Sequence, residues 1–126
     1  MASAQQWVML VNSSGGEIIG TSQQAFSNSS ASGNTAVVAG VVGRRYAVVS
    51  GLVTNNSTSA EMLVNFQSGS TAISATHMLA TGGGGWALTP ALGAYHFVTS
   101  AGSDLNVNLS DTGSVGIDLV YYELDA

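Results

Sequence analysis

Short stretches of alternating apolar and polar residues, interrupted by Gly, Ser and Asn, are the feature that most limits how this chain can fold. In residues 104–109, Leu105, Val107 and Leu109 alternate with polar residues. Successive side chains of a β-strand point to opposite faces, so this pattern predicts one buried face and one solvated face. The interruptions come too often for helices of ordinary length. We therefore predict an all-β chain.

Further strands are expected where a short apolar or alternating segment lies between turn residues. These segments are residues 7–11, 17–19, 35–39, 45–54, 60–67, 71–79, 86–89, 95–99 and 114–124. Residues 68–70, Ser-Gly-Ser, have the composition of a hairpin turn. So many short strands without helices favour two antiparallel sheets packed face to face, or a closed barrel. We expect an antiparallel β-sandwich, jelly-roll-like, with an extended N-terminal arm.

The predicted strand at residues 45–54 is apolar on both faces. Tyr46, Val48 and Leu52 are expected to share one face, and Ala47, Val49 and Val53 the other. Such a strand is expected to be covered on both sides.

Residues 23–34 have a different composition, because Ser, Asn, Gln and Ala dominate and Phe26 is the only large apolar residue. A segment of this kind cannot order itself by burial, so we expect a linker. The predicted organisation is an N-terminal arm with a Ser/Asn-rich linker over residues 1–34, and a β-sandwich domain over residues 35–126. The apolar residues of the arm then need a surface to cover, which a neighbouring subunit or partner supplies.

Charged residues make up only 7% of the chain, and the net charge is -5. Short neutral polar side chains lose little entropy and hydration when another protein covers them, so such a surface suits a protein partner. With Arg44 and Arg45 as the only basic residues, nucleic acid is not an expected partner. No apolar run is long enough for a membrane helix, no secretory signal is recognised, and no cysteine is present for a disulfide or thiolate site.

Two histidines and a run of four glycines are the residues that invite a chemical interpretation. Two histidines without spaced carboxylates or cysteines give an incomplete metal shell, so His77 and His96 are expected to be hydrogen-bonded structural residues. Glycines 82–85 precede Trp86 and a strand-like segment, whereas a phosphate-binding loop precedes a helix. We expect a loop joining two strands, or a loop that orders on docking with Trp86 as its anchor. We predict no cofactor and no bound metal.

The acidic residues of the C-terminal third do not indicate catalysis. Asp104, Asp111 and Asp118 are more simply explained as turn and solvated positions than as the acid and base of a glycosidase. Asp118 interrupts an apolar run, so it is expected to face solvent or to meet Arg44 or Arg45, because an unpaired buried carboxylate is destabilising by several kcal/mol. No nucleophile motif accompanies the histidines. The chain is not expected to be an enzyme.

Four blocks together resemble the small β-sandwich cement or decoration proteins of tailed-bacteriophage capsids. They are VMLVNSSGGEIIGT at residues 8–21, AGVVGRRYAVVS at residues 39–50, VNFQSGST at residues 64–71 and GSDLNVNLS at residues 102–110. Their order along the chain is similar as well. The Ser/Asn-rich segment near residues 27–34 and the glycines at 82–85 depart from that pattern.

The resemblance implies a fold and a role. The role is that of a structural virion protein that binds the outside of a phage capsid and cements the assembled shell. Its partners are then the major capsid protein and copies of itself, as a homotrimer, on the capsid exterior after synthesis in the host cytoplasm. We expect the capsid or subunit interface to include Trp7, Phe26, Arg44, Arg45 and Trp86.

An alternative function is the carbohydrate- or receptor-binding head of a phage fibre or tail. Small jelly rolls with exposed aromatic rings stack on sugars. Four rings are candidates for such a platform: Trp86, Tyr95, Tyr121 and Tyr122.

Overall fold

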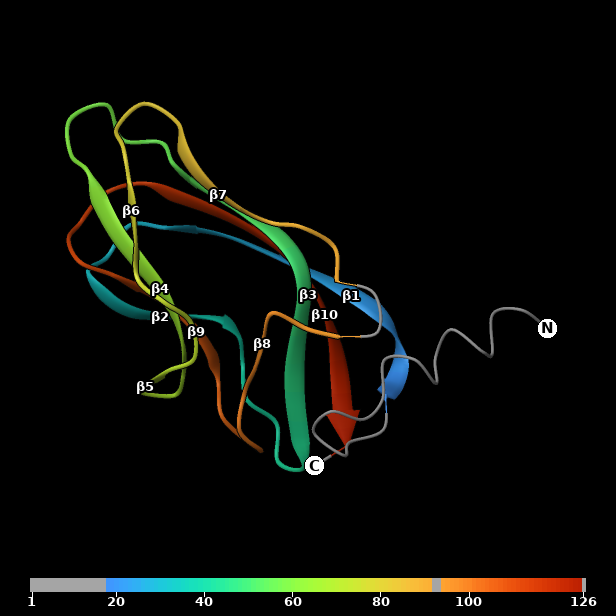
Figure 1. Ribbon diagram of the computed structural model, residues 1–126. Helices are drawn as coiled ribbons and strands as arrows, with labels where there is room; N and C mark the ends of the chain where they lie inside the picture. The colour runs from blue at the N-terminus through green and yellow to red at the C-terminus, as the bar shows by residue number, and fades with distance from the viewer. Residues whose placement is uncertain (1–17, 92–93, 126) are drawn as a thin grey trace.

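The described residues form a two-layered sandwich of antiparallel sheets (Figure 1). The computed structural model describes residues 18–91 and 94–125, which contain no helix and hence no helical membrane span. The strands are β1 (Ile18–Ser29), β2 (Gly33–Val38), β3 (Arg44–Asn55), β4 (Met62–Ser68), β5 (Thr71–Ala72), β6 (His77–Leu79), β7 (Gly84–Leu88), β8 (Phe97–Val98), β9 (Leu105–Leu109) and β10 (Val115–Asp125). The prediction of an all-β sandwich is confirmed.

The strand order nests early strands against late ones. One sheet has the order β1-β10-β3-β7, with β8 also paired to β3, and the other has the order β2-β9-β4-β5, with β6 also paired to β4. The first strand therefore pairs with the last, and the second pairs with the last but one. Of the strands between them in the sequence, β3 pairs with β7 and β8, and β4 pairs with β5 and β6. Folding such nested hairpins over into two sheets gives the jelly-roll arrangement that was expected.

The core lies between the sheets and is built from alternate residues of the strands. In β10 every second residue from Val115 to Tyr121 points inward and is at most 6% exposed. Leu105, Val107 and Leu109 of β9 meet them from the opposite sheet, as their spacing predicted. Each aliphatic side chain buried in this way contributes about 1.5–3 kcal/mol relative to an exposed one.

A bulge in β3 changes which residues point inward. Tyr121 pairs with Val48, but Val120 pairs with Ser50, so Val49 has no partner in β10. An extra residue in one strand reverses the facing of all residues beyond it. The expectation that Leu52 shares a face with Tyr46 and Val48 is therefore wrong, and Leu52 lies on the outer surface at 45% exposure.

The segment expected to be a linker belongs to the sheets instead. Most of residues 23–34 lie in β1 and at the start of β2, and residues 23–29 pair without interruption with β10. The composition is misleading here because an edge strand is held by backbone hydrogen bonds and needs little apolar burial. Ser29, at an inward position, is 2% exposed. Residues 1–17 of the predicted arm lie outside the described residues.

The hairpin after β4 has the predicted turn, with Gly69 at a φ of +59°. The strand predicted for residues 71–79 is divided into β5 and β6. Between them the Ser74 side chain enters the ladder, because the Phe66 amide donates to Ser74 Oγ at 2.8 Å instead of to a backbone carbonyl. This side-chain bond interrupts the strand.

A test of this packing uses Gly51, whose partner in β10 is Leu119. A Cβ at Gly51 would lie 2.5 Å from the Asp118 carbonyl oxygen and 2.7 Å from Leu119 Cδ2. We predict that Gly51→Ala lowers the free energy of unfolding by about 1–3 kcal/mol, the usual cost of overpacking. Gly85→Ala is the matched control, since its nearest neighbour would be 3.4 Å away. Urea denaturation measures both, and equal stabilities would contradict the packing described.

Candidate interaction surfaces

Large apolar side chains that remain exposed mark three places on the surface. Phe26 and Leu52 lie on the outer face of the first sheet, Val41 and Val42 in the β2–β3 connection, and Leu63 and Met78 on the outer face of the second sheet; they are the six large hydrophobic residues exposed among those described. Single exposed apolar residues are ordinary, but pairs on the same face of an otherwise polar surface are candidates for contact with a partner.

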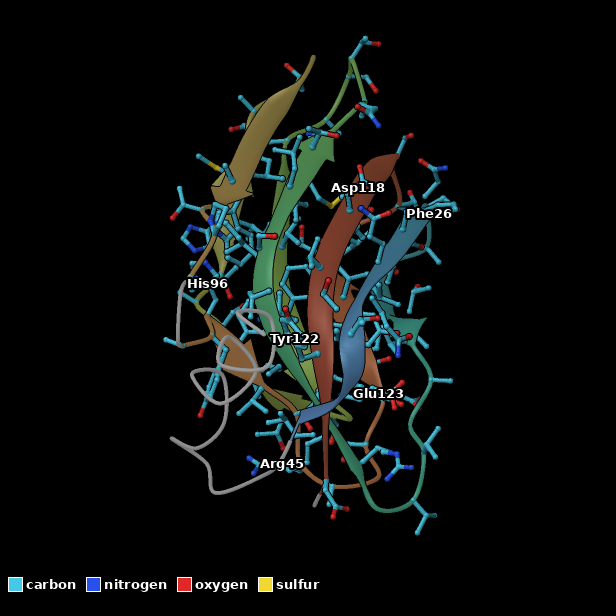
Figure 2. All side chains as sticks on the ribbon, turned by 90° about the vertical axis from the view of Figure 1, so that its right-hand side faces the viewer. Phe26, Arg45, His96, Asp118, Tyr122 and Glu123 are labelled. Atoms are coloured by element: carbon cyan, nitrogen blue, oxygen red, sulfur yellow. The ribbon has the colours of Figure 1, made fainter. Side chains whose placement is uncertain are left out.

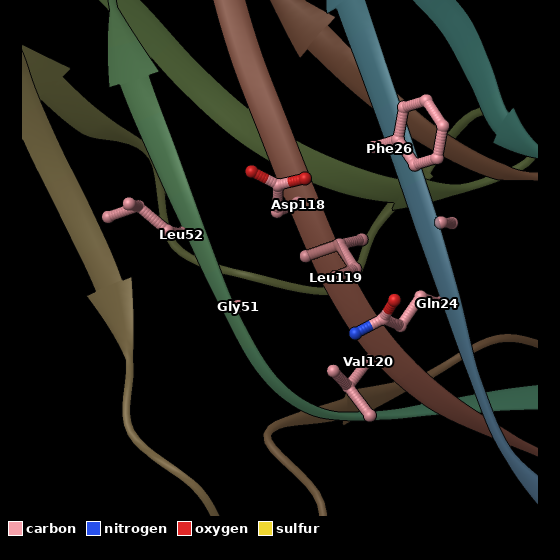
Figure 3. Close-up of a pocket in the computed structure, with 8 residues that line it drawn as sticks. Gln24, Phe26, Gly51, Leu52, Asp118, Leu119 and Val120 are labelled. Atoms are coloured by element: carbon pink, nitrogen blue, oxygen red, sulfur yellow. The ribbon is translucent and has the colours of Figure 1, made fainter.

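The first place is a groove of about 230 Å³ on the outer face of the first sheet (Figure 3). Its walls come from β1, β3 and β10, and its lining residues are Gln24, Ala25, Phe26, Gly51, Leu52, Asp118, Leu119 and Val120. The pairing places Phe26, Asp118 and Leu52 in one row across the three strands. Phe26 is 79% exposed, so its ring forms a rim of the groove and is not part of the core.

Asp118 faces solvent on this outer face, which was one of the two predicted outcomes. It forms no ion pair with Arg44 or Arg45. Because the carboxylate keeps its water, its position within an apolar strand carries little desolvation cost. The groove thus combines apolar walls with one negative charge.

The second place is the β2–β3 tip, which we define as residues 39–43. Val42 is 94% exposed and Val41 is 53% exposed. Two hydrogen bonds hold the beginning of the tip, since the Tyr46 hydroxyl donates to the Ala39 carbonyl at 2.7 Å and the Gly40 amide donates to Asp104 Oδ1 at 2.6 Å. Two valines are therefore presented to solvent on a fixed backbone.

Close packing of the backbone also fixes this tip. A Cβ on Gly40 would collide with the Gly102 carbonyl oxygen and the Ser103 carbonyl carbon, so only glycine allows the two loops to approach. The Arg44 amide closes the turn by donating to the Val41 carbonyl at 3.0 Å. A surface fixed before binding loses less entropy when a partner covers it.

The two arginines follow this tip and have different contacts. Arg44 lies 3.6 Å from Glu123 Oε2 and 3.9 Å from Asp125 Oδ1, across the β3–β10 pairing. Arg45 Nε donates to the Thr99 carbonyl at 3.1 Å. Figure 2 shows Arg45 at one end of the molecule, far from Phe26 and Asp118. The predicted interface residues Phe26, Arg44 and Arg45 thus do not form one patch.

Trp86 packs between the sheets, although it was expected as an interface anchor. Its ring centroid lies 4.1 Å from that of His77 and 5.6 Å from that of Phe66. It is half-buried against the core, so only part of the ring is available to a partner. Trp7, the remaining predicted interface residue, lies outside the described residues.

The aromatic rings considered for a sugar platform do not share a face. Tyr121 points inward, is 6% exposed and meets Tyr46 edge-on with a centroid distance of 5.5 Å. Tyr122 follows it in β10 and so points to the opposite side. With Trp86 also directed inward, these rings do not make a continuous stacking surface with Tyr95.

The histidines and the glycine run have structural contacts. The His96 ring contacts the Thr89 carbonyl through Nε2, and the His77 ring packs against that of Trp86 at an interplanar angle of 37°. Gly82 and Gly83 donate their amides to the Ser57 and Asn55 carbonyls at 2.7 and 2.8 Å, forming a turn before β7. Within residues 18–91 and 94–125, no three His, Asp or Glu side chains are close enough to hold a metal ion.

The third place lies on the outer face of the second sheet, which carries side-chain amides beside an apolar pair. Asn34 Nδ2 donates to Gln67 Oε1 at 2.9 Å, and Asn108 Nδ2 donates to Asn34 Oδ1 at 2.8 Å. Leu63 and Met78 are paired across β4 and β6 nearby. This face is neutral and able to hydrogen-bond, which suits contact with another polar protein surface.

Sequence reasoning missed Val41, Val42, Leu52 and Met78 as exposed apolar residues. A signal was present for the first two, because an apolar pair between Gly40 and Gly43 occupies a turn where polar residues are usual. The exposure of Leu52 follows from the β3 bulge, and no residue pattern in the sequence revealed that bulge.

Comparison with known proteins identifies no family for the chain. No family model matches the sequence, and no curated protein matches it. Among solved structures, a chain of the cyanophage Pam1 capsid asymmetric unit is similar at 12% identity, with 89% of each chain covered and a TM-score of 0.44. A chain of the IBDV viral particle is similar at 13% identity, with 84% of this chain and 39% of the other covered and a TM-score of 0.30.

Tyr46 and Tyr121 give the fold a dependence on alkaline pH. Burial, and secondarily the charge of Glu123, raise the pKa of both phenols above the ordinary value. A raised folded-state pKa means that stability is fully present below the unfolded pKa of about 10 and is lost as pH rises through the folded pKa. We predict that the melting temperature falls above about pH 10.

The variant Tyr46→Phe separates this effect from other alkaline losses. It removes the hydroxyl that donates to the Ala39 carbonyl, so stability at pH 8 drops by about 1 kcal/mol. Its further decline above about pH 10 should be shallower than that of the unmodified chain. Melting curves between these pH values measure both slopes, and parallel slopes would show that this phenol does not contribute.

Proposed function

We propose that this chain is a structural virion protein of a tailed phage, which binds the outside of the capsid and stabilises the assembled shell. The observation that carries the proposal is the β2–β3 tip, where Val41 and Val42 stand exposed on a backbone fixed by hydrogen bonds. An exposed apolar pair on a fixed backbone fits an apolar recess in a partner.

The surface chemistry supports a protein partner. Both outer sheet faces combine neutral amides with exposed apolar residues, and the groove carries one carboxylate. The choice of the capsid as the partner rests on the sequence blocks that resemble cement proteins. The block at residues 39–50 contains the β2–β3 tip itself. We further propose that the chain acts without catalysis, as a homotrimer on the capsid exterior, after synthesis in the host cytoplasm.

Stabilisation in this proposal follows from mass action. A protein that binds the assembled shell and not its dissociated subunits stabilises the shell by about 2.7 kcal/mol per site when its free concentration is 100 times Kd. A trimer that contacts several capsid subunits holds them together by multivalency, because the second contact forms at a high effective concentration. Modest contacts at each tip are then sufficient.

The proposal predicts the abundance of the chain in purified particles. Quantitative mass spectrometry of particles should give a ratio near one copy per major capsid subunit if the chain covers the shell. A few copies per particle would instead indicate a tail or vertex fibre, and absence from particles would overturn the virion role.

The tip can be tested by substitution. Val42→Asp places a charge where an apolar contact is expected, and we predict at least about tenfold weaker binding to particles that lack the chain. Val42 is 94% exposed, so the melting temperature should not change. Thr58→Asp, at an exposed site in the loop after the other end of β3, is the matched control and should bind normally. Equal binding of both variants would show that the tip is not part of the capsid interface.

A further inference from the structure

The free edges of the two sheets differ in how they are protected against pairing with another strand. The edge strand β7 has only five residues, and beyond it Ala91 and His96 donate their amides to the β3 carbonyls of Val49 and Val48. The edge strands β5 and β6 have two and three residues, and β2 carries a register shift between Ala36 and Val38. Short length, interruptions and bulges are the usual means of preventing edge association.

The edge strand β1 lacks these protections over its second half. Residues 23–29 pair with residues 121–115 of β10 without a register shift, and they contain no charge, proline or glycine. No described strand pairs with the other side of β1, so the backbone N–H and C=O groups of alternate residues point away from the sheet there. Figure 2 shows β1 at the margin of its sheet with Phe26 projecting from it.

We infer that the β1 edge is a self-association site, at which residues 23–29 pair antiparallel with the same residues of a second copy about a two-fold axis at Phe26. The two first sheets then become one continuous sheet with β1 strands at its centre. This inference concerns the chain alone and goes beyond the proposed capsid role, so either can fail without the other.

The sequence of β1 is complementary to itself in this register. Phe26 faces Phe26 of the second copy, and on the same outer face Gln24 faces Asn28. Aromatic pairs and amide pairs directly opposite each other are favourable in antiparallel sheets. Small residues meet on the inner face, where Ala25 faces Ser27. Because Phe26 is the midpoint of residues 23–29, every residue of this segment lies opposite a residue of the same segment in the second copy.

Charge does not oppose this pairing. Two charged residues of β10 lie beside this segment: Asp118, which neighbours Phe26, and Glu123, whose Oε1 accepts a hydrogen bond from Gln23 Nε2 at 3.0 Å at one end of the segment. The two Asp118 residues of a dimer are separated by three strand spacings, or about 14 Å, which exceeds the Debye length of about 8 Å at physiological ionic strength. A strand from an unrelated partner lacks this match of length, neutrality and facing residues, so a second copy is the occupant that we assign.

Disulfide trapping tests the register, since the chain has no cysteine of its own. Phe26→Cys should give a covalent dimer under mild oxidation, because residues opposite each other have Cβ atoms about 4.5–5.5 Å apart, close to disulfide geometry. Gln24→Cys mixed with Asn28→Cys should also crosslink. Gln24→Cys alone should not, because its two copies would be about 13 Å apart. Met78→Cys, exposed on the other sheet, is the matched control.

A second measurement examines association without crosslinking. Phe26→Lys opposes like charges across the axis and should raise the dimer Kd at least about tenfold by sedimentation equilibrium, while Met78→Lys should leave it unchanged. If a three-fold contact also forms, the two contacts give a hexamer, and Phe26→Lys halves its mass. The inference is overturned by a monomeric unmodified chain at about 1 mM, by an association that Phe26→Lys leaves intact, or by equal crosslinking of Phe26→Cys and Met78→Cys.

Discussion

The antiparallel pairing of β10 with both β1 and β3 is the interaction on which the rest of the sandwich depends. β10 lies between these strands along most of its length, and its inward residues from Val115 to Tyr121 form one wall of the core. Its outward residues meanwhile supply Asp118 and Val120 to the groove. One strand thus positions the apolar interior and the first outer surface, because its side chains alternate between them.

Much of the fold was predictable because strand periodicity is local. The inward positions of β9 and the turn at Gly69 followed from patterns of a few residues. The β3 bulge and the strand character of residues 23–29 did not, since both are fixed by pairing with β10 from the far end of the sequence. A strand held mainly by backbone hydrogen bonds leaves little trace in its side chains, so β1 has the composition of a linker.

The candidate surfaces were less predictable than the fold. Phe26 was identified because it is a large apolar residue in a polar segment, and it is exposed. Trp86 was chosen because Trp is favoured at interfaces and because it follows the glycine run, but its contacts with His77 and Phe66 direct it inward. The exposure of a strand residue depends on which face of the sheet its side chain points to, and the strand register sets that face. Residue type alone does not predict it. The low content of charged residues said more about the surface than the choice of individual residues did, because it applies to every face of the molecule.

The pairing of β1 with β10 also sets an order of events during synthesis. A ribosome adds about 5–20 residues per second, so roughly 4 to 17 s pass between the completion of β1 and the appearance of the first residue of β10. Throughout that interval β1 is an uncharged strand with both edges unpaired. The first sheet therefore cannot be completed until the C-terminal strand has been synthesised, and until then the backbone groups of β1 that later bond to β10 are hydrogen-bonded to water.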